Sequence, residues 1–240
     1  MRQAAARDDR TLAVVASTAD VLGHPAARRE TLTAAEHRRA AAFRFDRDRD
    51  DFVAAHLLVR LCAGRLLGVP AGALTLEQHC ADCGSREHGK PSLAGVPGVH
   101  VSLSHTRRVV AAAAGRRPVG VDVERAQASG TALGMAGRVL SQRELRTMRA
   151  AARPDRYFLR QWVRKEALVK IGGTTLRDMA KADLSALPAE VPDGSPRLSR
   201  HGELHVLDWS DARRDAVAAV VGAGRPRLGV AAVPLSDITD

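Results

Sequence analysis

Short apolar or alternating runs recur along both halves of the chain, a pattern typical of β-strands. The runs that predict strands cover residues 11–17, 74–79, 99–104, 108–114, 118–125, 204–209, 216–221 and 228–233. We expect the last three to form an antiparallel sheet that mirrors the strands of the first half. The pattern therefore predicts a chain of two similar halves.

Segments with apolar residues three or four positions apart predict helices between these strands. Their expected ranges are 33–45, 47–67, 137–151 and a segment within 156–173. Thr33 and Glu36 have the spacing of a capping box at the start of the first helix, and Gly68 follows the end of the second. His56 is interpreted as a hydrogen-bonded core or boundary histidine, with a ligand as the alternative. Residues 188–202 are polar and contain prolines, so a mobile insertion is expected there.

The expected helix within 156–173 carries a notable charged pair. Glu166 and Lys170 are four residues apart, so they project from one face of the helix. Lys165 and Lys170 are two of only four lysines in the chain, which favours a compact ammonium at this place. The alternative is a solvated helix pair that stabilises the helix by a few tenths of a kcal/mol. We expect Asp155 to cap the start of this helix.

The charge narrows the choice of partner. The formal net charge is +10, which points to an acidic or polyanionic partner. Nucleic acid is disfavoured because aromatic residues make up only 3% of the chain and no nucleic-acid-binding motif is present. A membrane span needs roughly 18 consecutive apolar residues, which no segment offers, and the N-terminus lacks the apolar core of a signal peptide. We expect a cytoplasmic protein with no membrane or nucleic-acid partner.

The length allows two small subdomains. A chain of 240 residues can bury a core as one large domain or as two small ones of about 100 residues each, and we expect two halves. The expected boundaries are 11–118 for the N-terminal subdomain and 119–233 for the C-terminal one, with tails at 1–10 and 234–240.

Two carboxylates are the strongest candidates for metal chemistry. Asp122 and Glu124 are two positions apart on the expected strand 118–125, so both point to the same face. Like charges placed together repel, and a divalent cation removes that repulsion; paired carboxylates with water and phosphate oxygens are typical of Mg²⁺ sites. An exposed edge strand with alternating charges is the alternative.

Polar groups suited to an anion occur earlier in the chain. Ser104 and His105 follow a predicted strand, where side chains and free N–H groups can meet an anionic ligand. Gly89, Lys90 and Pro91 join a permissive glycine, an ammonium and a fixed φ, which can hold an extended loop against a ligand.

The cysteines do not form a disulfide framework, because there are only three of them. Cys80 and Cys83 form a C-x-x-C pair flanked by His79 and His88, and both residue types suit zinc. A structural zinc site normally has a second, separated ligand pair, which is missing here. We therefore favour a tight turn with two nearby thiols and keep zinc as the alternative.

The order of the chemical motifs along the chain is informative. They are G-K-P at 89–91, S-H at 104–105, G-x-D-x-E at 120–124, S-x-x-E at 141–144 and W-x-x-K-E-x-x-x-K at 162–170. This ordered set resembles the 4′-phosphopantetheinyl transferases, specifically the two-repeat, surfactin-synthetase-activating (Sfp) type rather than the short trimeric type.

The resemblance implies an α+β fold. It would be a pseudo-twofold pair of subdomains, each a small, mostly antiparallel sheet with packed helices, with a coenzyme A site in the cleft between them. It also implies the reaction: transfer of phosphopantetheine from coenzyme A to a serine of a carrier protein, with release of adenosine 3′,5′-bisphosphate.

The resemblance further assigns the reacting groups. Asp122, Glu124 and Glu166 would bind Mg²⁺, and Lys170 would hold the pyrophosphate. Glu166 is the candidate general base, with a water held by Glu124 as the alternative. Lys165 would be a charge at the rim of the site.

The nucleotide end of coenzyme A would meet a separate set of residues. The resemblance places Lys90 and Pro91 there, with Ser104, His105 and Arg39, and brings His105 near the 3′-phosphate. Family members often carry a basic residue where this chain has Asp51, so Arg47 or Arg49 would have to substitute for it.

The basic charge would suit the acidic helix that carrier proteins present. The expected partners are acyl or peptidyl carrier domains of fatty-acid, polyketide or nonribosomal-peptide synthesis, bound by a monomer. Apolar residues near Glu144 are candidate contacts, with core packing as the alternative; they are Val139, Leu140, Leu145 and Met148. A basic, non-catalytic protein that binds nucleic acid or an acidic protein is the alternative function.

Overall fold

The computed structural model describes residues 11–80, 83–86, 88–125, 133–223, 230–232 and 234–238. The expected N-terminal tail at 1–10 lies outside these residues, as do the last two residues of the chain.

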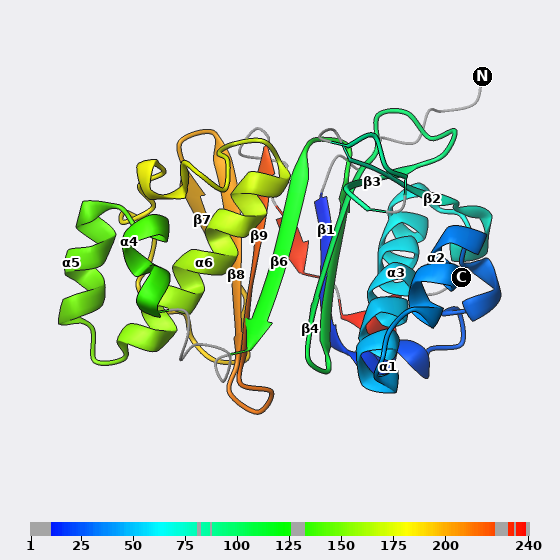
Figure 1. Ribbon diagram of the computed structural model, residues 1–240, viewed down its shortest axis with the longest axis horizontal. Helices are drawn as coiled ribbons and strands as arrows, with labels where there is room; N and C mark the ends of the chain where they lie inside the picture. The colour runs from blue at the N-terminus through cyan, green and yellow to red at the C-terminus, as the bar shows by residue number, and fades with distance from the viewer. Residues whose placement is uncertain are drawn as a thin grey trace, which may run out of the picture.

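Strands and helices both contribute to the structure, which is α+β (Figure 1). The strands are β1 (Thr11–Ser17), β2 (Leu76–His79), β3 (Lys90–Leu93), β4 (His100–Thr106), β5 (Val109–Gly115), β6 (Val119–Arg125), β7 (Arg197–His201), β8 (Leu204–Asp211), β9 (Ala216–Ala223) and β10 (Val230–Ala232). The α-helices are α1 (Thr18–Leu22), α2 (Ala34–Ala41), α3 (Asp46–Leu67), α4 (Ala136–Val139), α5 (Gln142–Ala150) and α6 (Pro154–Lys170).

Two four-stranded sheets form the centre of the molecule. Their strand orders are β10-β1-β5-β4 and β6-β9-β8-β7, and β2 pairs with β3 in a separate hairpin. Small apolar side chains of the two sheets pack against each other, among them Ala111, Ala113, Val121 and Ala218. Figure 1 shows α3 on one outer side and α6 on the other. The layers are therefore helix, sheet, sheet, helix.

The central strands are apolar on both faces because each sheet is covered twice. Every residue of β5 is buried, and so is every residue of β9 except the last. One face meets the other sheet, and the opposite face meets a helix: α3 packs on the first sheet and α6 on the second. This explains why these runs read as continuous Ala and Val rather than as alternation.

Helix ends follow their capping residues. The capping box of Thr33 and Glu36 is present at α2, and Gly68 ends α3 in the left-handed conformation with φ of 69°. The expected single helix at 137–151 is wrong: it divides into α4 and α5, because Ser141 and Glu144 form a second capping box that starts a new helix.

The start of α6 also differs from the prediction. Pro154 occupies the first turn, where its missing N–H costs nothing, and Arg153 precedes it without a side-chain cap. Asp155 is therefore a first-turn acidic residue rather than the cap.

Two strand predictions need correction. The last strand does not join an antiparallel sheet of the second half, because β10 pairs parallel with β1 in the first sheet. Residues 188–202 are not only an insertion, because they contain β7, which pairs antiparallel with β8. Polar β7 lies at the edge of its sheet, where one exposed face is tolerated.

Lys165 is not a charge at the rim, because its side chain is completely buried. Its Nζ donates to the Glu144 carboxylate at 2.6 Å and to the carbonyls of Val139 and Met179 at 2.7 and 2.9 Å. Glu144 also accepts from the N–H of Leu184. This ion pair joins α6 to α5 and to the chain that follows α6.

Core packing accounts for the apolar residues around Glu144. Val139, Leu140 and Leu145 are buried, and Met148 packs against them. Trp162 packs on the same cluster. Among the described residues, no helix combines the length and apolarity that crossing a bilayer requires.

Candidate active site

Gly120 brings helix α6 unusually close to strand β6. A Cβ atom at this position would lie 2.1 Å from the carbonyl oxygen of Ala167 and 3.0 Å from Cβ of Lys170. No larger residue fits without moving the helix. The glycine of the G-x-D-x-E motif therefore sets the distance between Asp122 on β6 and the side chains at the end of α6.

Asp122 is nearly buried, and its two carboxylate oxygens have unlike surroundings. Oδ1 accepts a hydrogen bond from the Ser104 hydroxyl at 2.7 Å and from Nζ of Lys170 at 3.0 Å. Lys170 also donates to the carbonyl of Val121 at 2.7 Å. Oδ2 is buried and has no hydrogen-bond partner among the described residues. An unpaired buried carboxylate oxygen is costly, so it marks a place for a ligand.

The negative charge of Asp122 acts on both Glu124 and Glu166. Burial and the neighbouring Asp122 raise the pKa of Glu124 to about 7, and Glu166 contributes to the same shift. Burial and then Asp122 raise the pKa of Glu166 above its ordinary value of 4.5, while Lys170 lowers it. Two elements, β6 and α6, thus bring three mutually repelling carboxylates together.

The three carboxylates do not yet form a closed ligand cage. Among the described residues, the only group of three Cys, His, Asp or Glu ligand atoms that all lie within 4.8 Å of one another is elsewhere in the chain. Lys170 stands beside Asp122 as its counter-ion.

These residues fit a hard divalent cation. Carboxylate oxygens are the donors that Mg²⁺ prefers, and it keeps several waters, so a cage made only of protein is not needed. The unpaired Oδ2 of Asp122 is available, and a cation would relieve the repulsion that raises the pKa values of Glu124 and Glu166.

Lys90, Pro91 and Lys170 line the same hollow. Two adjoining cavities of about 440 and 660 Å³ are both lined by these three residues, although the first two come from β3 and the third from α6. Gly89 adopts φ of 108° just before Lys90, and a Cβ there would lie 2.2 Å from the carbonyl oxygen of His79. The glycine is thus required for the turn that presents Lys90 and Pro91.

His105 lies among charged groups of both signs. Partial loss of hydration lowers its pKa, and the charges of His56, Lys170 and Arg39 lower it further, whereas Asp51 raises it. Arg39 of the first half and Lys170 of the second half therefore both act on His105 with positive charge. An anion would be attracted there.

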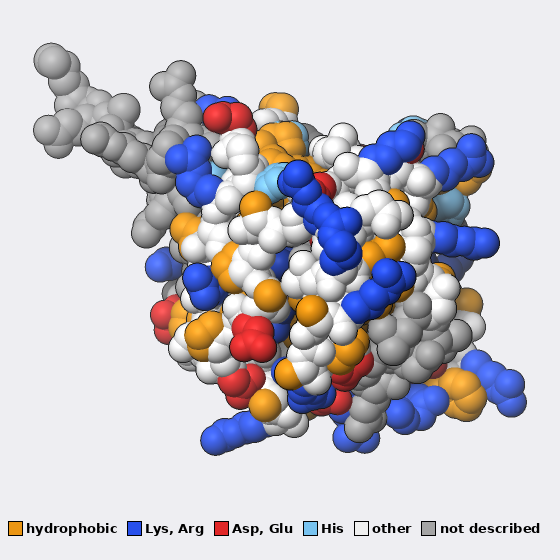
Figure 2. All heavy atoms as spheres, turned by 90° about the vertical axis from the view of Figure 1, so that its left-hand side faces the viewer, with side chains coloured by type: hydrophobic (Ala, Val, Ile, Leu, Met, Phe, Trp, Pro, Cys, Tyr) orange, Lys and Arg blue, Asp and Glu red, His pale blue; other side chains and the backbone are white. Residues whose placement is uncertain are grey.

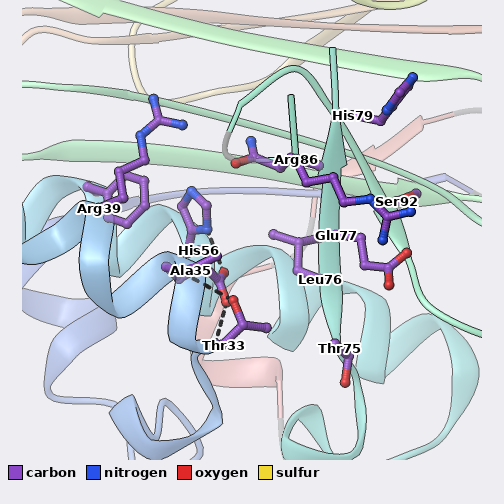
Figure 3. Close-up of a pocket in the computed structure, with 13 residues that line it drawn as sticks. Thr33, Ala35, Arg39, His56, Thr75, Leu76, Glu77, His79, Arg86 and Ser92 are labelled. Atoms are coloured by element: carbon purple, nitrogen blue, oxygen red, sulfur yellow. Dashed lines mark hydrogen bonds and ion pairs between the residues drawn. The ribbon is translucent and has the colours of Figure 1, made fainter. Parts of the chain in front are cut away.

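Arg39 lies over the ring of Phe52 at 5.3 Å and lines a cavity of about 330 Å³ (Figure 3). In the close-up, Arg39 and His56 come from the α2–α3 side, and Leu76 of β2 points toward them, whereas Glu77 points to the other side of the strand. Arg86 lines the same cavity. The cavity is a candidate for a phosphate or a heterocycle.

His56 is the satisfied core histidine that the sequence predicts. It is buried, and its Nδ1 lies 2.6 Å from the carboxylate of Glu36. The same carboxylate accepts two hydrogen bonds from Arg60 at 2.6 and 2.8 Å. Its hydrogen bonds to His56 and Arg60 hold the pKa of Glu36 down at about 2, against the opposing effect of burial. Glu36 thus joins α2 to α3 as well as capping α2.

Asp51 has a structural partner instead of a phosphate. It is buried, accepts from the backbone N–H of Arg108 at 3.1 Å and also accepts from the Thr18 hydroxyl. Arg47 lines a cavity of about 410 Å³ together with Asp51 and His105, whereas Arg49 pairs with Asp46 at 3.0 Å. Arg47 also pairs with an aspartate, Asp48, at 3.4 Å, so the two arginines differ in that Arg47 lines this cavity.

Two residues of the site make contacts that the sequence did not predict. Gly120 was read only as part of a motif, although its position opposite a helix is what brings the site together. Ser104 was expected at the nucleotide, and the structure shows its hydroxyl on Asp122. The S-x-x-E spacing at 141–144 was the available signal for the buried Lys165–Glu144 pair, but nothing local to Lys165 reveals its burial.

Comparison with known proteins points to one superfamily. Residues 118–221, which include Asp122, Glu124, Glu166 and Lys170, match the family model described as the 4′-phosphopantetheinyl transferase superfamily. The second half of the chain is therefore similar to this superfamily.

Three curated relatives are similar to parts of the chain. The chain is 28% identical to a 4′-phosphopantetheinyl transferase of Bacillus subtilis over 147 residues. This aligned segment covers 58% of this chain and 61% of that protein. It is 30% identical to the 4′-phosphopantetheinyl transferase psf-1 of Bacillus pumilus over 140 residues, which are 57% of this chain and 56% of that protein. It is 31% identical to the 4′-phosphopantetheinyl transferase Sfp of Bacillus subtilis strain 168 over 94 residues, which are 38% of this chain and 41% of that protein. The chain is thus similar to transferases that include Sfp, and it spans 41 to 61% of the length of these relatives.

Proposed function

We propose that this protein transfers phosphopantetheine from coenzyme A to a serine of an acyl or peptidyl carrier domain, with Mg²⁺, and releases adenosine 3′,5′-bisphosphate. One observation supports this most: Asp122, Glu124 and Glu166 are coupled by charge beside a buried carboxylate oxygen that lacks a partner. Relatives named as 4′-phosphopantetheinyl transferases make this the family's chemistry to test first.

Asp122, Glu124 and Glu166 would hold the Mg²⁺, which would neutralise charge on the pyrophosphate of coenzyme A. The Ser104 hydroxyl and Lys170 fix Oδ1 of Asp122, so Oδ2 faces the ligand position. Lys170, about a third exposed, can exchange its contact with Asp122 for a pyrophosphate oxygen. Its charge then counters the charge that develops on the leaving phosphate.

Glu166 would take the proton from the attacking serine hydroxyl. A carboxylate with a raised pKa is a stronger base than an ordinary one. Burial, the largest cause of the raised pKa of Glu166, would remain when the cation binds and relieves the repulsion from Asp122. The hydroxyl oxygen then forms a bond to the β-phosphorus as the bond from that phosphorus to the bridging oxygen breaks. Glu124, whose pKa is raised to about 7, is the alternative base through a water molecule.

The rest of coenzyme A would extend along the hollows shared by the two halves. Lys90 and Pro91 face Lys170 across them, and His105 and Arg39 would receive the 3′-phosphate end. We propose that the halves, 11–118 and 119–233, are a pseudo-twofold pair with the substrate between them. In this arrangement the first half binds the nucleotide and the second half carries the reacting groups.

The carrier domain would dock on the helical side of the second half. Figure 2 shows Lys and Arg side chains spread over this side of the molecule. Arg143, Arg146 and Arg149 recur every three residues along α5 and are exposed. An acidic helix would complement them and speed encounter. We propose that the enzyme acts as a cytoplasmic monomer on these domains.

Mass spectrometry of an apo carrier domain tests the proposal. Incubation with coenzyme A and Mg²⁺ should add one phosphopantetheine to the carrier, and chelation of Mg²⁺ should prevent it. Asp122→Asn and Glu166→Gln should each lose the activity, whereas Glu203→Gln in the exposed turn between β7 and β8 should retain it. If both site variants keep rates within a factor of two of the wild type while Arg39→Ala abolishes partner binding, the protein is a basic binding protein and not this enzyme.

A further inference from the structure

The connection between β2 and β3 carries two thiols and an imidazole that phosphopantetheine transfer does not use. One ligand atom from each of Cys80, Cys83 and His88 lies within 4.8 Å of the other two. No other triple of His, Cys, Asp or Glu in the described part of the chain meets this condition. Sγ of Cys83 lies 3.4 Å from Nε2 of His88. None of the three cysteines is in a disulfide.

The backbone around the first two residues is shaped to hold them together. The N–H of Gly84 donates to the carbonyl of Cys80 at 2.9 Å, and Gly84 adopts φ of 70°, which favours glycine. The N–H of Cys80 donates to the carbonyl of Ser85 at 2.9 Å. The turn therefore closes on itself and sets both thiols on one side. His88, near the other end of the connection, lies close to both thiols.

We propose that Cys80, Cys83 and His88 bind a Zn²⁺ ion. Two thiolates and one imidazole form a donor set typical of zinc, and its small tetrahedral shell suits atoms so close together. A fourth position remains for water or another donor. The sequence alone argued against zinc because a second ligand pair is missing, but the structure supplies His88 as the third ligand. Cys83 and His88 are exposed, so the ion can enter from solvent.

The ion would fix the part of the chain that reaches the proposed coenzyme A site. His88 is followed by Gly89, which is locked against His79, and then by Lys90 and Pro91, which line the hollow beside Lys170. A metal tie at His88 would reduce the freedom of this segment. This consequence rests on the proposed function, whereas the metal site itself does not.

Metal analysis of the full-length protein tests the site without reference to activity. The protein is purified under reducing conditions, stripped with a chelator, reloaded with Zn²⁺ or Co²⁺ and desalted. We expect one equivalent of either metal per chain, and for Co²⁺ the near-ultraviolet charge-transfer absorption of thiolate ligands. Cys80→Ser, Cys83→Ser and His88→Ala should each weaken metal affinity by more than the roughly 10–100-fold that loss of an outer partner costs.

Two controls match the chemistry of these variants. Cys62→Ala removes a buried thiol of α3, and His79→Ala removes an imidazole that lies outside the close group. Both should bind metal like the wild type, and thermal unfolding checks that every variant is folded. The proposal is overturned if reloaded wild type holds no metal, if the cobalt absorption is missing, or if His79→Ala loses metal as fully as His88→Ala.

A second measurement separates this site from the proposed reaction. Compared with the zinc-loaded wild type, His88→Ala lacks the metal, so its KM for coenzyme A should rise. Its kcat should change little, because the variant loosens Lys90 without replacing it. If the protein binds zinc at this site but shows no transfer, the proposed function fails and the metal site stands. An unchanged KM in metal-free His88→Ala would overturn the positioning role.

Discussion

Asp122 shows how one side chain can serve both folding and chemistry. One oxygen is held by Ser104 and Lys170, which keeps the carboxylate in place, and the other is buried without a partner. Its charge also reaches Glu124 and Glu166 and raises the pKa of each. The three acids therefore act as a coupled set, and a change at one of them must appear at the others.

The first prediction tests this coupling. Asp122→Asn removes a negative charge, so the pKa of Glu124 should fall from about 7 toward its ordinary value of 4.5, and that of Glu166 should fall as well. Carboxylate NMR titration of the metal-free protein measures both. Asp178→Asn, an exposed change in the segment after α6, is the control and should leave both values unmoved. Unchanged values in Asp122→Asn would show that the acids are not neighbours in solution.

The second prediction concerns stability and pH. Glu124 binds its proton more tightly in the folded state than in the unfolded state, because its pKa is raised to about 7 from 4.5. The metal-free protein should therefore lose stability as pH rises from about 4.5 to 7, and Glu124→Gln should flatten this part of the profile. Urea unfolding across this pH range measures it, and Mg²⁺ should restore stability to the wild type at the upper end. A wild-type profile that rises through the same range would contradict the account.

Elements bring these residues together through close packing and buried ion pairs. Gly120 lets α6 approach β6, and Lys165 ties the same helix to Glu144. Arg164, one position earlier, is also buried and pairs with Asp208 of β8 at 2.7 Å. The helix that carries Glu166 and Lys170 is thus fixed on three sides.

The third prediction is that Gly120→Ala disturbs the site indirectly, because the added methyl group displaces α6 and does not itself contact the carboxylates. The added methyl group meets the backbone of Ala167, so α6 must shift, at a cost of about 1–3 kcal/mol in the free energy of unfolding. Transfer should fall by roughly 10²-fold, because small displacements of reacting groups have large effects on rate. Gly137→Ala, in open space on α4, is the matched control. Full activity in Gly120→Ala would show that the close approach is not needed.

The fourth prediction compares a buried and an exposed lysine. Lys165→Ala leaves the Glu144 carboxylate buried without its counter-ion, so the free energy of unfolding should fall by about 3–5 kcal/mol. Lys181 pairs with Asp178 on the surface, and Lys181→Ala should have no measurable effect. Urea unfolding measures both. Equal losses in the two variants would mean that burial does not decide the strength of these pairs.

Local sequence signals were sufficient for most elements and failed where the decisive contact is distant. Strand β1 and the long helix α3 follow from periodicity and from Gly68. The division of the helix at 137–151 was missed, although Ser141 and Glu144 have the same spacing that correctly predicted the start of α2. The burial of Lys165 could not be predicted, because its partners come from 14 to 26 residues away.

The whole molecule combines two sheets whose inner faces are packed with small residues, and each sheet carries its own helix (Figure 1). Sequence order suggested the two groups of strands, but it could not show that β10 returns to pair with β1 of the first sheet. Strand pairing is a long-range property, whereas periodicity reports only which face of a strand is buried. The motifs gave the candidate residues, and only the fold could show Lys90 and Lys170 lining one hollow.

The central claim is that β6 and α6 together hold one divalent cation against coenzyme A. A crystal structure of the protein with coenzyme A and Mn²⁺ in place of Mg²⁺ tests it through the anomalous signal of the metal. We predict a peak at direct ligand distance, near the 2.0–2.1 Å typical of Mg²⁺, from both the unpaired oxygen of Asp122 and the carboxylate of Glu166, beside the pyrophosphate. A pyrophosphate bound away from these two carboxylates, or a metal that touches neither of them, would contradict it.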